Sequence, residues 1–317
     1  MSTTQLAYIV FGIVLVLALL FDLGLMSKKH ATVSIKKALW QTLFWVGLSM
    51  VFWAFLWIEK DSYVATKYIS AYLMEWSLSI DNIFVFILIF SFFKVNEMDA
   101  GRALLVGILL AIVFRVIFIA LGIELINRFH WLMYVFGAFL LYTGIKLFIR
   151  KEDDEYDPQQ SKVYKAVTKL FRITDRQANG KYVIPIQNKW YFTSLAVVVL
   201  MLAATDIVFA LDSIPTVVTL VRSSAKQAFT PDEVLVIYSS NVFAVLGLRS
   251  LFFLLRGAVN RFVYLQQGIA VVLVFIGIKM LIEFFDIHIS IYLSLGVIVL
   301  CIAGSIVASL LKKQPQA

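Results

Sequence analysis

Two segments far apart in the chain carry acidic side chains at the same spacing inside apolar stretches. Glu75 is followed six residues later by Asp81, and Asp206 is followed six residues later by Asp212. A charged side chain at the centre of a membrane-spanning helix costs roughly 2.5–3.5 kcal/mol. Four such carboxylates therefore need either fixed basic partners in the protein or a cation that moves.

Polar oxygen ligands accompany these acids, because Asn82 follows Asp81 and Ser213 follows Asp212. Oxygen ligands suit Mg²⁺, Ca²⁺ and Mn²⁺ better than Zn²⁺ or Cu⁺. The histidines lie in or near predicted loops, and the single cysteine, Cys301, excludes a multi-cysteine metal site. The predicted metal site comprises Glu75, Asp81, Asn82, Asp206, Asp212 and Ser213.

Asp22 is a further candidate for this site. It lies near the end of the first apolar run, in Phe21-Asp22-Leu23-Gly24. It fits equally well as a carboxylate at the membrane interface and as an additional ion ligand or partner of Arg115.

Basic side chains inside the apolar stretches offer the alternative of internal charge compensation. Arg115 and Arg249 lie in the middle of predicted spans, whereas Lys146 and Lys279 lie nearer the ends, where long side chains reach toward the interface. The two arginines would neutralise two acids and leave the other two without a strong partner. A divalent cation matches that remainder, so the sequence favours an ion site over purely structural pairing.

The geometry of a helix predicts that one of these segments bends. Six residues of helix advance about 9 Å and turn about 600°, so the two acids of a segment point roughly 120° apart. Pro215 lacks an N–H, and its ring clashes with the carbonyl of Leu211 in a straight helix. We therefore expect a helix break at Pro215 that aims Asp212 and nearby carbonyls at the ion. The other segment has no proline, so Asn82 would ligate there without a break.

The composition identifies the solvent of the chain as lipid. Of 317 residues, 61% are hydrophobic and only 15% are charged, and the apolar residues fall in blocks of about 20, the length that spans a bilayer as a helix. The fold class predicted is all-α and polytopic, with about nine transmembrane helices. Their approximate limits are 6–26, 38–58, 66–92, 102–124, 130–149, 190–221, 234–255, 263–283 and 287–311.

Most lysines and arginines lie in alternate loops, on one side of the predicted membrane. The positive-inside rule then places the N-terminus outside and the C-terminus in the cytoplasm. This sidedness accounts for the net charge of +8, so we expect a lipid bilayer and no nucleic acid as partner. The long loop 150–189 opens with an acidic run, interpreted as a solvated linker rather than a metal sensor, and continues into a short amphipathic surface helix near 162–171.

The two acidic segments belong to a longer internal repeat. Arg115 follows Glu75 by 40 residues, and Arg249 follows Asp206 by 43. A Gly-Ile-Lys sequence ending at Lys146 and again at Lys279 completes each copy. A three-helix copy enters the membrane from the opposite side to its partner, which is the inverted-repeat plan of many transporters. The expected organisation is a two-helix segment (1–65), repeat one (66–149), a cytoplasmic loop (150–189), repeat two (190–283), and a last helix with its tail (284–317).

These motifs resemble a known family. The segments 75–84, 206–215, 241–249 and 275–279 are similar to motifs of the TerC family of bacterial membrane proteins, and the length and motif order resemble its Alx branch. The resemblance covers roughly residues 6–311. It implies Mn²⁺ export across the bacterial inner membrane and a relation to LysE-type exporters. It also implies that the family's acidic motif residues are Glu75, Asp81, Asp206 and Asp212, with Asp22 as its first-helix aspartate.

Three functions remain open at this point. The first is a divalent metal exporter with Mn²⁺ as substrate and Ca²⁺ as the alternative. The second is a LysE-type exporter of a cationic amino acid, for which Trp76 could supply a cation–π contact. The third is a membrane protein that assists secretion or assembly. No enzyme is expected, because no nucleophile–base pair or nucleotide-binding signature occurs, and the oligomeric state is undetermined.

Overall fold

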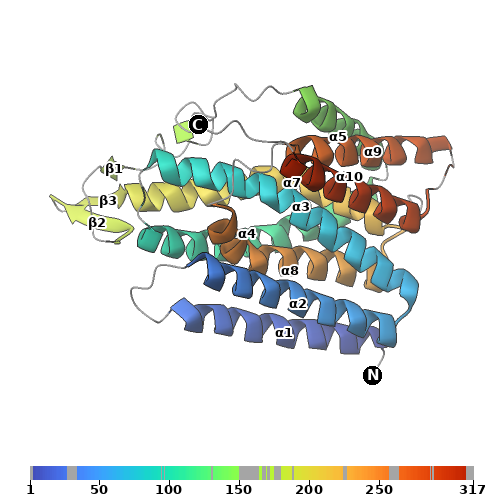
Figure 1. Ribbon diagram of the computed structural model, residues 1–317, viewed down its shortest axis with the longest axis horizontal. Coiled ribbons are helices and arrows are strands. Elements are labelled where there is room, and N and C mark those ends of the chain that lie inside the picture. Colours follow the sequence, from blue (N-terminus) through green and yellow to red (C-terminus); the bar gives the residue numbers. More distant parts are fainter. Residues whose placement is uncertain are drawn as a thin grey trace.

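The computed structural model shows a bundle of long helices (Figure 1). It describes residues 3–26, 34–93, 95, 97–129, 131–149, 164–165, 169, 172–174, 180–187, 189–223, 227–256, 264–285, 287 and 289–311. Within these ranges the side chains at 21–26, 80, 81, 84, 88, 92, 97, 98, 133, 208, 211, 212, 265 and 283 are outside the description. The acidic run near 152–157 and most of the expected surface helix also lie outside the described residues.

Nine long helices account for most of the described chain, which confirms the predicted all-α, polytopic fold. In chain order they are α1 (Thr3–Met26), α2 (Ile35–Glu59), α3 (Ser62–Phe92), α4 (Glu97–Arg128), α5 (Leu132–Ile149), α7 (Ser194–Val221), α8 (Pro231–Leu255), α9 (Leu265–Ile282) and α10 (Ile291–Leu311). A short 3-10 helix, η3 (Glu283–Phe285), follows α9. Within the described ranges, α1, α2, α4, α8 and α10 are long and apolar enough to cross a membrane by length and composition alone.

A small sheet at one end of the bundle was not predicted (Figure 1, left). Its strands are β1 (Ile173–Thr174), β2 (Val183–Ile186) and β3 (Lys189–Thr193), in the order β1-β3-β2. β3 is antiparallel to β2 and parallel to β1. The helix expected at 190–221 was therefore wrong at its start, because residues 189–193 form β3 and α7 begins at Ser194. Thr193 ends that strand and caps α7, because its hydroxyl accepts a hydrogen bond from the Ala196 backbone N–H.

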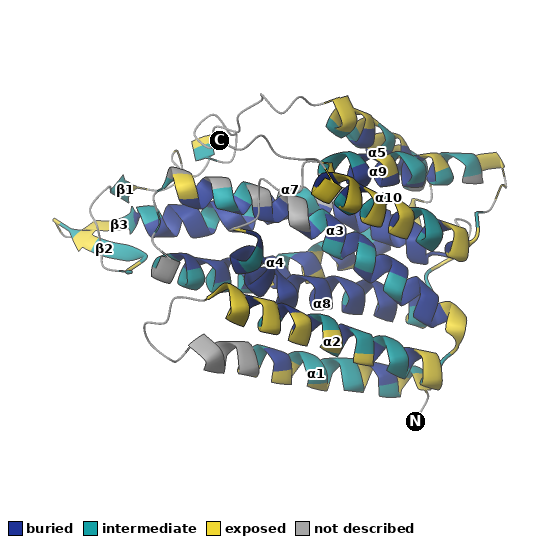
Figure 2. Cartoon of the chain, viewed as in Figure 1, coloured by how far each residue is buried: buried dark blue, intermediate teal, exposed yellow. Residues whose placement is uncertain are grey.

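The centre of the bundle consists of α3, α4, α7 and α8. α8 packs against α3, α2 and α4, and α7 packs against α4 and α3. Figure 2 shows these central helices as the most buried, whereas α1, α2, α5 and α10 turn exposed residues outward. The exposed residues include large apolar ones such as Leu20, Trp40, Phe148 and Leu300. An apolar surface of this extent is stable against lipid rather than against water.

Small residues bring α5 and α9 into backbone contact, and this helix pair has the most extensive contacts in the described chain. A Cβ atom on Gly144 would lie 2.9 Å from the Ala270 carbonyl oxygen, and one on Gly277 would lie 2.8 Å from the Gly137 carbonyl oxygen. Glycine is required at these two points because any side chain would force the helices apart.

Candidate ion site

Arg115 lies at the centre of a buried polar cluster. Its Nε and Nη2 donate hydrogen bonds to the two oxygens of Asp206, each at 3.0 Å. Its Nη1 donates to Glu75 Oε2 at 2.7 Å and to Asn241 Oδ1 at 3.1 Å. Asn241 in turn donates from Nδ2 to Glu75 Oε1 at 2.5 Å. We call these four residues the acid cluster.

Each member of the acid cluster comes from a different central helix. Glu75 lies on α3, Arg115 on α4, Asp206 on α7 and Asn241 on α8. All four side chains are almost completely buried, with exposed fractions of 0% for Glu75 and 1% for the others. The cluster therefore depends on the packing of all four helices.

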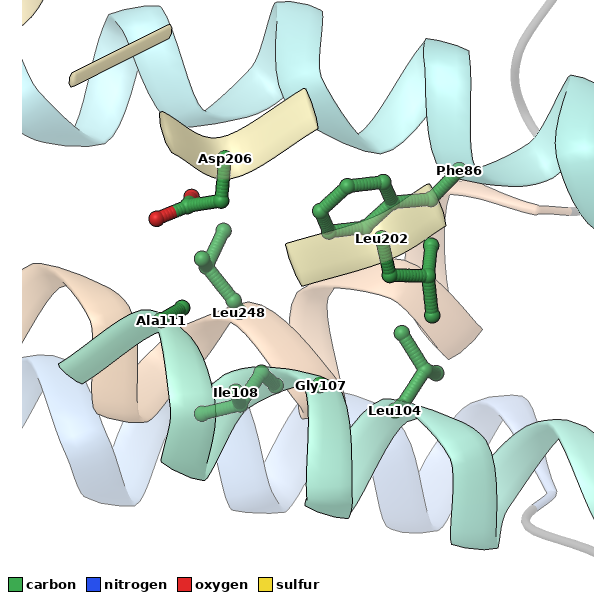
Figure 3. Close-up of a pocket in the computed structure, with 8 residues that line it drawn as sticks. All are labelled: Phe86, Leu104, Gly107, Ile108, Ala111, Leu202, Asp206 and Leu248. Atoms are coloured by element: carbon green, nitrogen blue, oxygen red, sulfur yellow. The ribbon is translucent and has the colours of Figure 1, made fainter. Parts of the chain in front are cut away.

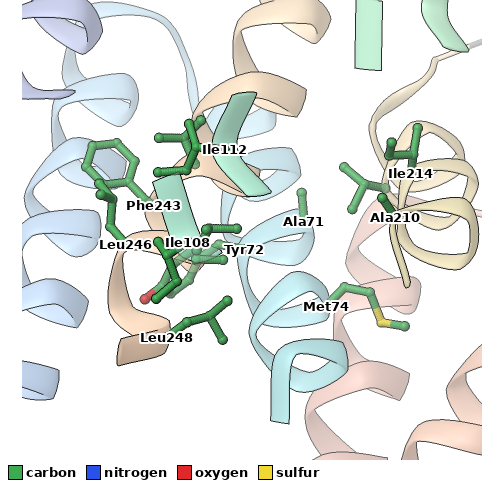
Figure 4. Close-up of a cluster of buried hydrophobic side chains, with 14 of the residues drawn as sticks. Ala71, Tyr72, Met74, Ile108, Ile112, Ala210, Ile214, Phe243, Leu246 and Leu248 are labelled. Carbon is green, nitrogen blue, oxygen red and sulfur yellow. The ribbon is translucent and has the colours of Figure 1, made fainter. Parts of the chain in front are cut away.

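The same four helices also carry a core of buried apolar side chains. Figure 4 shows members of this core, among them Tyr72 and Met74 of α3, Ile112 of α4, Ile214 of α7 and Phe243 of α8. Water cannot screen charges in such surroundings, so ion pairs interact more strongly there than at a surface. Removing one partner of a buried pair leaves an uncompensated charge, which is strongly destabilising.

The charges within the acid cluster do not balance. Two carboxylates share one guanidinium, so the four side chains carry two negative charges and one positive charge when the acids are ionised. A proton or a second cation near the cluster would neutralise the difference. In the part of the chain that the structure describes, no group of three or more His, Cys, Asp or Glu side chains could hold a metal ion, and Arg115 occupies the place beside both carboxylates.

A small cavity adjoins Asp206. It is lined by Phe86, Leu104, Gly107, Ile108, Ala111, Leu202, Asp206 and Leu248, which come from all four central helices (Figure 3). The space inside is enough for about one water molecule. Asp206 is the one charged residue of this lining.

The predicted ligands are placed only in part. Asn82 and Ser213 are both buried. Asp81 lies on α3 and Asp212 on α7, but their side chains are outside the described residues. The same is true of Asp22 on α1. Convergence of the second acid of each segment on one ion stays a prediction.

The helix break expected at Pro215 was wrong. α7 is one helix from Ser194 to Val221 with Pro215 inside it. Proline removes one backbone donor, but unwinding the helix in lipid would expose several more groups that no water can satisfy. Neighbouring helices bury Pro215 and Thr216, and the Thr219 hydroxyl donates to the Pro215 carbonyl at 2.8 Å. The helix therefore tolerates the proline.

The four basic residues expected to compensate charge differ in burial and in partners. Arg115 pairs with two acids, one from each segment. Arg249 is buried on α8, 8% exposed. Lys146 is exposed in the last turn of α5, and Lys279 in the last turn of α9 donates to the Ser294 hydroxyl at 3.1 Å. Both lysines occupy helix ends, as the sequence predicts.

A second group of charges lies near the N-terminal end of α8, which the sequence did not predict. Lys67 of α3 donates to Glu233 at 2.9 Å and to the Ser223 hydroxyl at 2.6 Å. Lys60 forms an ion pair of 2.8 Å with Asp232. Glu233 also completes a capping box with Thr230 at the start of α8. We call Lys60, Lys67, Ser223, Asp232 and Glu233 the rim cluster. It joins α3 to the facing ends of α7 and α8.

The fold and the acid cluster together define a polytopic membrane protein with a buried, mixed-charge site between its central helices. Residues 60–317 match the family model described as "Integral membrane protein TerC family". The chain belongs to the TerC family.

Several curated proteins resemble the chain over nearly its whole length. A protein of Myxococcus xanthus described as an uncharacterized membrane protein is 40% identical over 95% of this chain and 91% of its own length. An uncharacterized membrane protein of Rickettsia felis is 37% identical over 97% of this chain and 98% of its own. The "Putative membrane-bound redox modulator Alx" of Escherichia coli is 38% identical over 91% of this chain and 89% of its own. No solved structure matches the chain.

Proposed function

We propose that the protein transports a divalent cation, with Mn²⁺ as its substrate, out of the bacterial cytoplasm across the inner membrane. The observation that carries the proposal is that Glu75 and Asp206, from two different helices deep in the bundle, share Arg115 as an ionic partner. A cation that enters can take over one carboxylate from Arg115, and a proton can later replace that cation. Exchange of metal for proton on carboxylates is a general property of such ligands.

Reciprocal packing supports the inverted repeats on which this mechanism rests. Gly137 and Gly277 contact one another across α5 and α9, as do Gly144 and Ala270. Aligning the two Gly-Ile-Lys sequences makes Gly144 the counterpart of Gly277, and Gly137 the counterpart of Ala270. Contacts that map onto each other in this way are what a two-fold axis between two copies produces. A site between such copies can open to either side in turn.

Flux measured in proteoliposomes tests the proposal. We expect wild-type protein to move Mn²⁺, and we expect Asp206→Asn and Asp212→Asn to abolish that flux while the protein still inserts. Glu124→Gln serves as the control, because Glu124 is exposed and pairs with Arg128 one turn further along α4. If these variants transport Mn²⁺ like the wild type, Asp206 and Asp212 do not belong to the transport site. Flux of lysine or arginine without Mn²⁺ would favour an amino-acid exporter instead.

The relatives described as redox modulators supply a second candidate, a redox role. A thiol-based role in this chain would have to use Cys301, which lies half-buried on α10. Cys301→Ser separates the two candidates, because metal transport would persist and a thiol-dependent redox activity would not.

A further inference from the structure

Three layers follow one another along the contact between α3 and α8. The outermost layer is the ion pair of Lys67 with Glu233, and the innermost is the hydrogen bond of Asn241 with Glu75. On each helix these two layers are eight residues apart, which is about two turns or 12 Å. The rim cluster therefore lies between the acid cluster and the end of the bundle expected to face outside.

Two apolar side chains form the middle layer. Ala71 lies four residues after Lys67 and four before Glu75, so these three residues share one side of α3. Ile237 has the same halfway place on α8. Both apolar residues are 0% exposed, and Figure 4 shows Ala71 on α3 within the core. The contact between α3 and α8 is therefore closed on the outer side of the acid cluster.

The burial of the outermost pair makes its separation an all-or-none event. The side chains of Lys67 and Glu233 are 5% and 4% exposed. If a buried ion pair separates while its surroundings stay dry, both charges lose their compensation, which is strongly unfavourable. Water must therefore enter as the pair breaks. This contact favours two states, one with the pair formed and water excluded, and one with the pair broken and water admitted.

Glu233 is the fixed member of this pair, and Lys67 is the member that can move. Glu233 Oε1 accepts hydrogen bonds from the backbone N–H and the hydroxyl of Ser223, and its Oε2 accepts from the backbone N–H of Thr230. The ammonium of Lys67 lies 4.6 Å from the centre of the Tyr63 ring on its own helix, and Tyr63 is 43% exposed. This ring can hold the ammonium after it leaves Glu233.

We propose that Lys67 and Glu233 form the outer gate of the protein, so that a cation passes from the acid cluster to the outside between α3 and α8 only after Lys67 leaves Glu233. This inference rests on the proposed function, because it needs a cation that leaves the acid cluster. The pair joins the two expected repeats, since Lys67 belongs to 66–149 and Glu233 to 190–283. A motion of one repeat against the other opens contacts of this kind.

Labelling of a cysteine in the middle layer tests the gate in full-length protein in lipid nanodiscs, where a reagent reaches both faces. Ala71→Cys is combined with Cys301→Ser, which removes the native thiol. The probe is a charged methanethiosulfonate, which does not enter lipid, and mass spectrometry measures its rate of reaction. We expect slow labelling in this parent protein. Glu233→Gln should raise the rate about tenfold or more, because it removes one charge of a buried pair, while glutamine still completes the capping box.

Two controls separate opening of the gate from general loosening of the bundle. Asp232→Asn should leave the rate at that of the parent, because Asp232 precedes Glu233 and forms a more exposed pair with Lys60. Ala103→Cys is the second control, since Ala103 is also 0% exposed but lies near the opposite end of the bundle, on α4. It should stay slow in the Glu233→Gln protein. Faster labelling at Ala103→Cys as well would overturn the gate.

A second variant keeps the test decisive if Glu233→Gln fails to fold. Lys67→Met breaks the same pair from the other helix and should also speed labelling of Ala71→Cys. Labelling at the parent rate in either folded variant would overturn the gate, and Mn²⁺ flux by the wild type would then leave the transporter standing without it. Faster labelling in these variants alone, with no Mn²⁺ flux by the wild type, would keep the gate and overturn the proposed Mn²⁺ transport.

Discussion

Arg115 is the residue on which the charge distribution of the core depends. It is 1% exposed, and it bridges α3 and α7 through Glu75 and Asp206. Such a residue has a structural role in any mechanism, because both acids lose their described ionic partner if it is removed. A neutral substitute leaves two carboxylates in apolar surroundings unless both take up protons.

We therefore expect Arg115→Gln to lower the free energy of unfolding by about 3–5 kcal/mol, the usual cost of breaking a buried pair. Thermal unfolding in detergent measures the loss. Arg128→Gln is the control, since Arg128 forms an exposed pair with Glu124 on the same helix. Exposed pairs of this kind contribute roughly 0–1 kcal/mol. Equal stability of the two variants would show that Arg115 does not hold the acids together.

Sequence reasoning identified the charged members of the acid cluster and missed its neutral member. Glu75, Asp206 and Arg115 stand out because a charge in an apolar stretch is costly and needs a reason. The uncharged Asn241 costs less to bury than a carboxylate or a guanidinium. It was therefore noted only as part of the family motif 241–249 and was not assigned to the site. The available signal was an amide in the middle of an apolar helix, eight residues before Arg249, with no turn or cap to explain it.

At the scale of elements, the crossing of α5 and α9 is the most extensive helix contact that the structure describes. Backbone atoms meet there at Gly137, Gly144 and Gly277. α5 packs mostly on α9 and has few contacts with α4 and α7. The small residues at this crossing therefore decide whether α5 stays attached to the bundle.

We expect Gly144→Leu to separate the two helices and to lower stability by about 1–3 kcal/mol or more, because overpacking a tight contact is destabilising. Thermal unfolding and limited proteolysis of the loop after α5 measure the effect. Gly296→Leu is the matched control, because a Cβ on Gly296 of α10 would meet nothing within 4 Å. A Gly144→Leu protein as stable as that control would show that the crossing is not a tight contact in the membrane.

The helices could be predicted where the length of an apolar block determines them. The continuity of α7 at Pro215 and the strands β1 to β3 could not be predicted in this way. The nine long helices follow from apolar blocks, and their ends differ from the structure by a few residues. Pro215 misled the prediction because local propensity was weighed without the penalty for unwinding a helix in lipid. The strands β1 to β3 lie in or beside a charged loop, where no apolar periodicity indicates a sheet.

At the scale of the whole molecule, one end of the bundle carries a cluster of ion pairs and the other carries a small sheet. The rim cluster joins helices through ion pairs at one end, and Lys67 and Glu233 are both buried there. The sheet lies at the other end (Figure 1). From the positive-inside rule we expect the sheet end to face the cytoplasm, because the loops on that side carry most of the basic residues.

We expect a fluorescent protein fused after residue 317 to fluoresce, and alkaline phosphatase fused at the same place to be inactive. Both outcomes follow from a cytoplasmic C-terminus, since the first reporter folds in the cytoplasm and the second needs the oxidising side. Fusions after residue 128, at the opposite end of the bundle, are the control and should give the reverse pattern. An active phosphatase at the C-terminus would invert the direction assigned to transport.

The α5–α9 crossing also limits how the molecule can change shape. Helices α3 to α5 and α7 to α9 meet there through backbone contacts that resist sliding, whereas the contacts around Arg115 are side-chain hydrogen bonds that can be exchanged. A rocking motion of one group against the other therefore disrupts least if it pivots on this crossing. The contact between α5 and α9 would then be the pivot of the motion, and the acid cluster would lie where the rotation changes distances between helices.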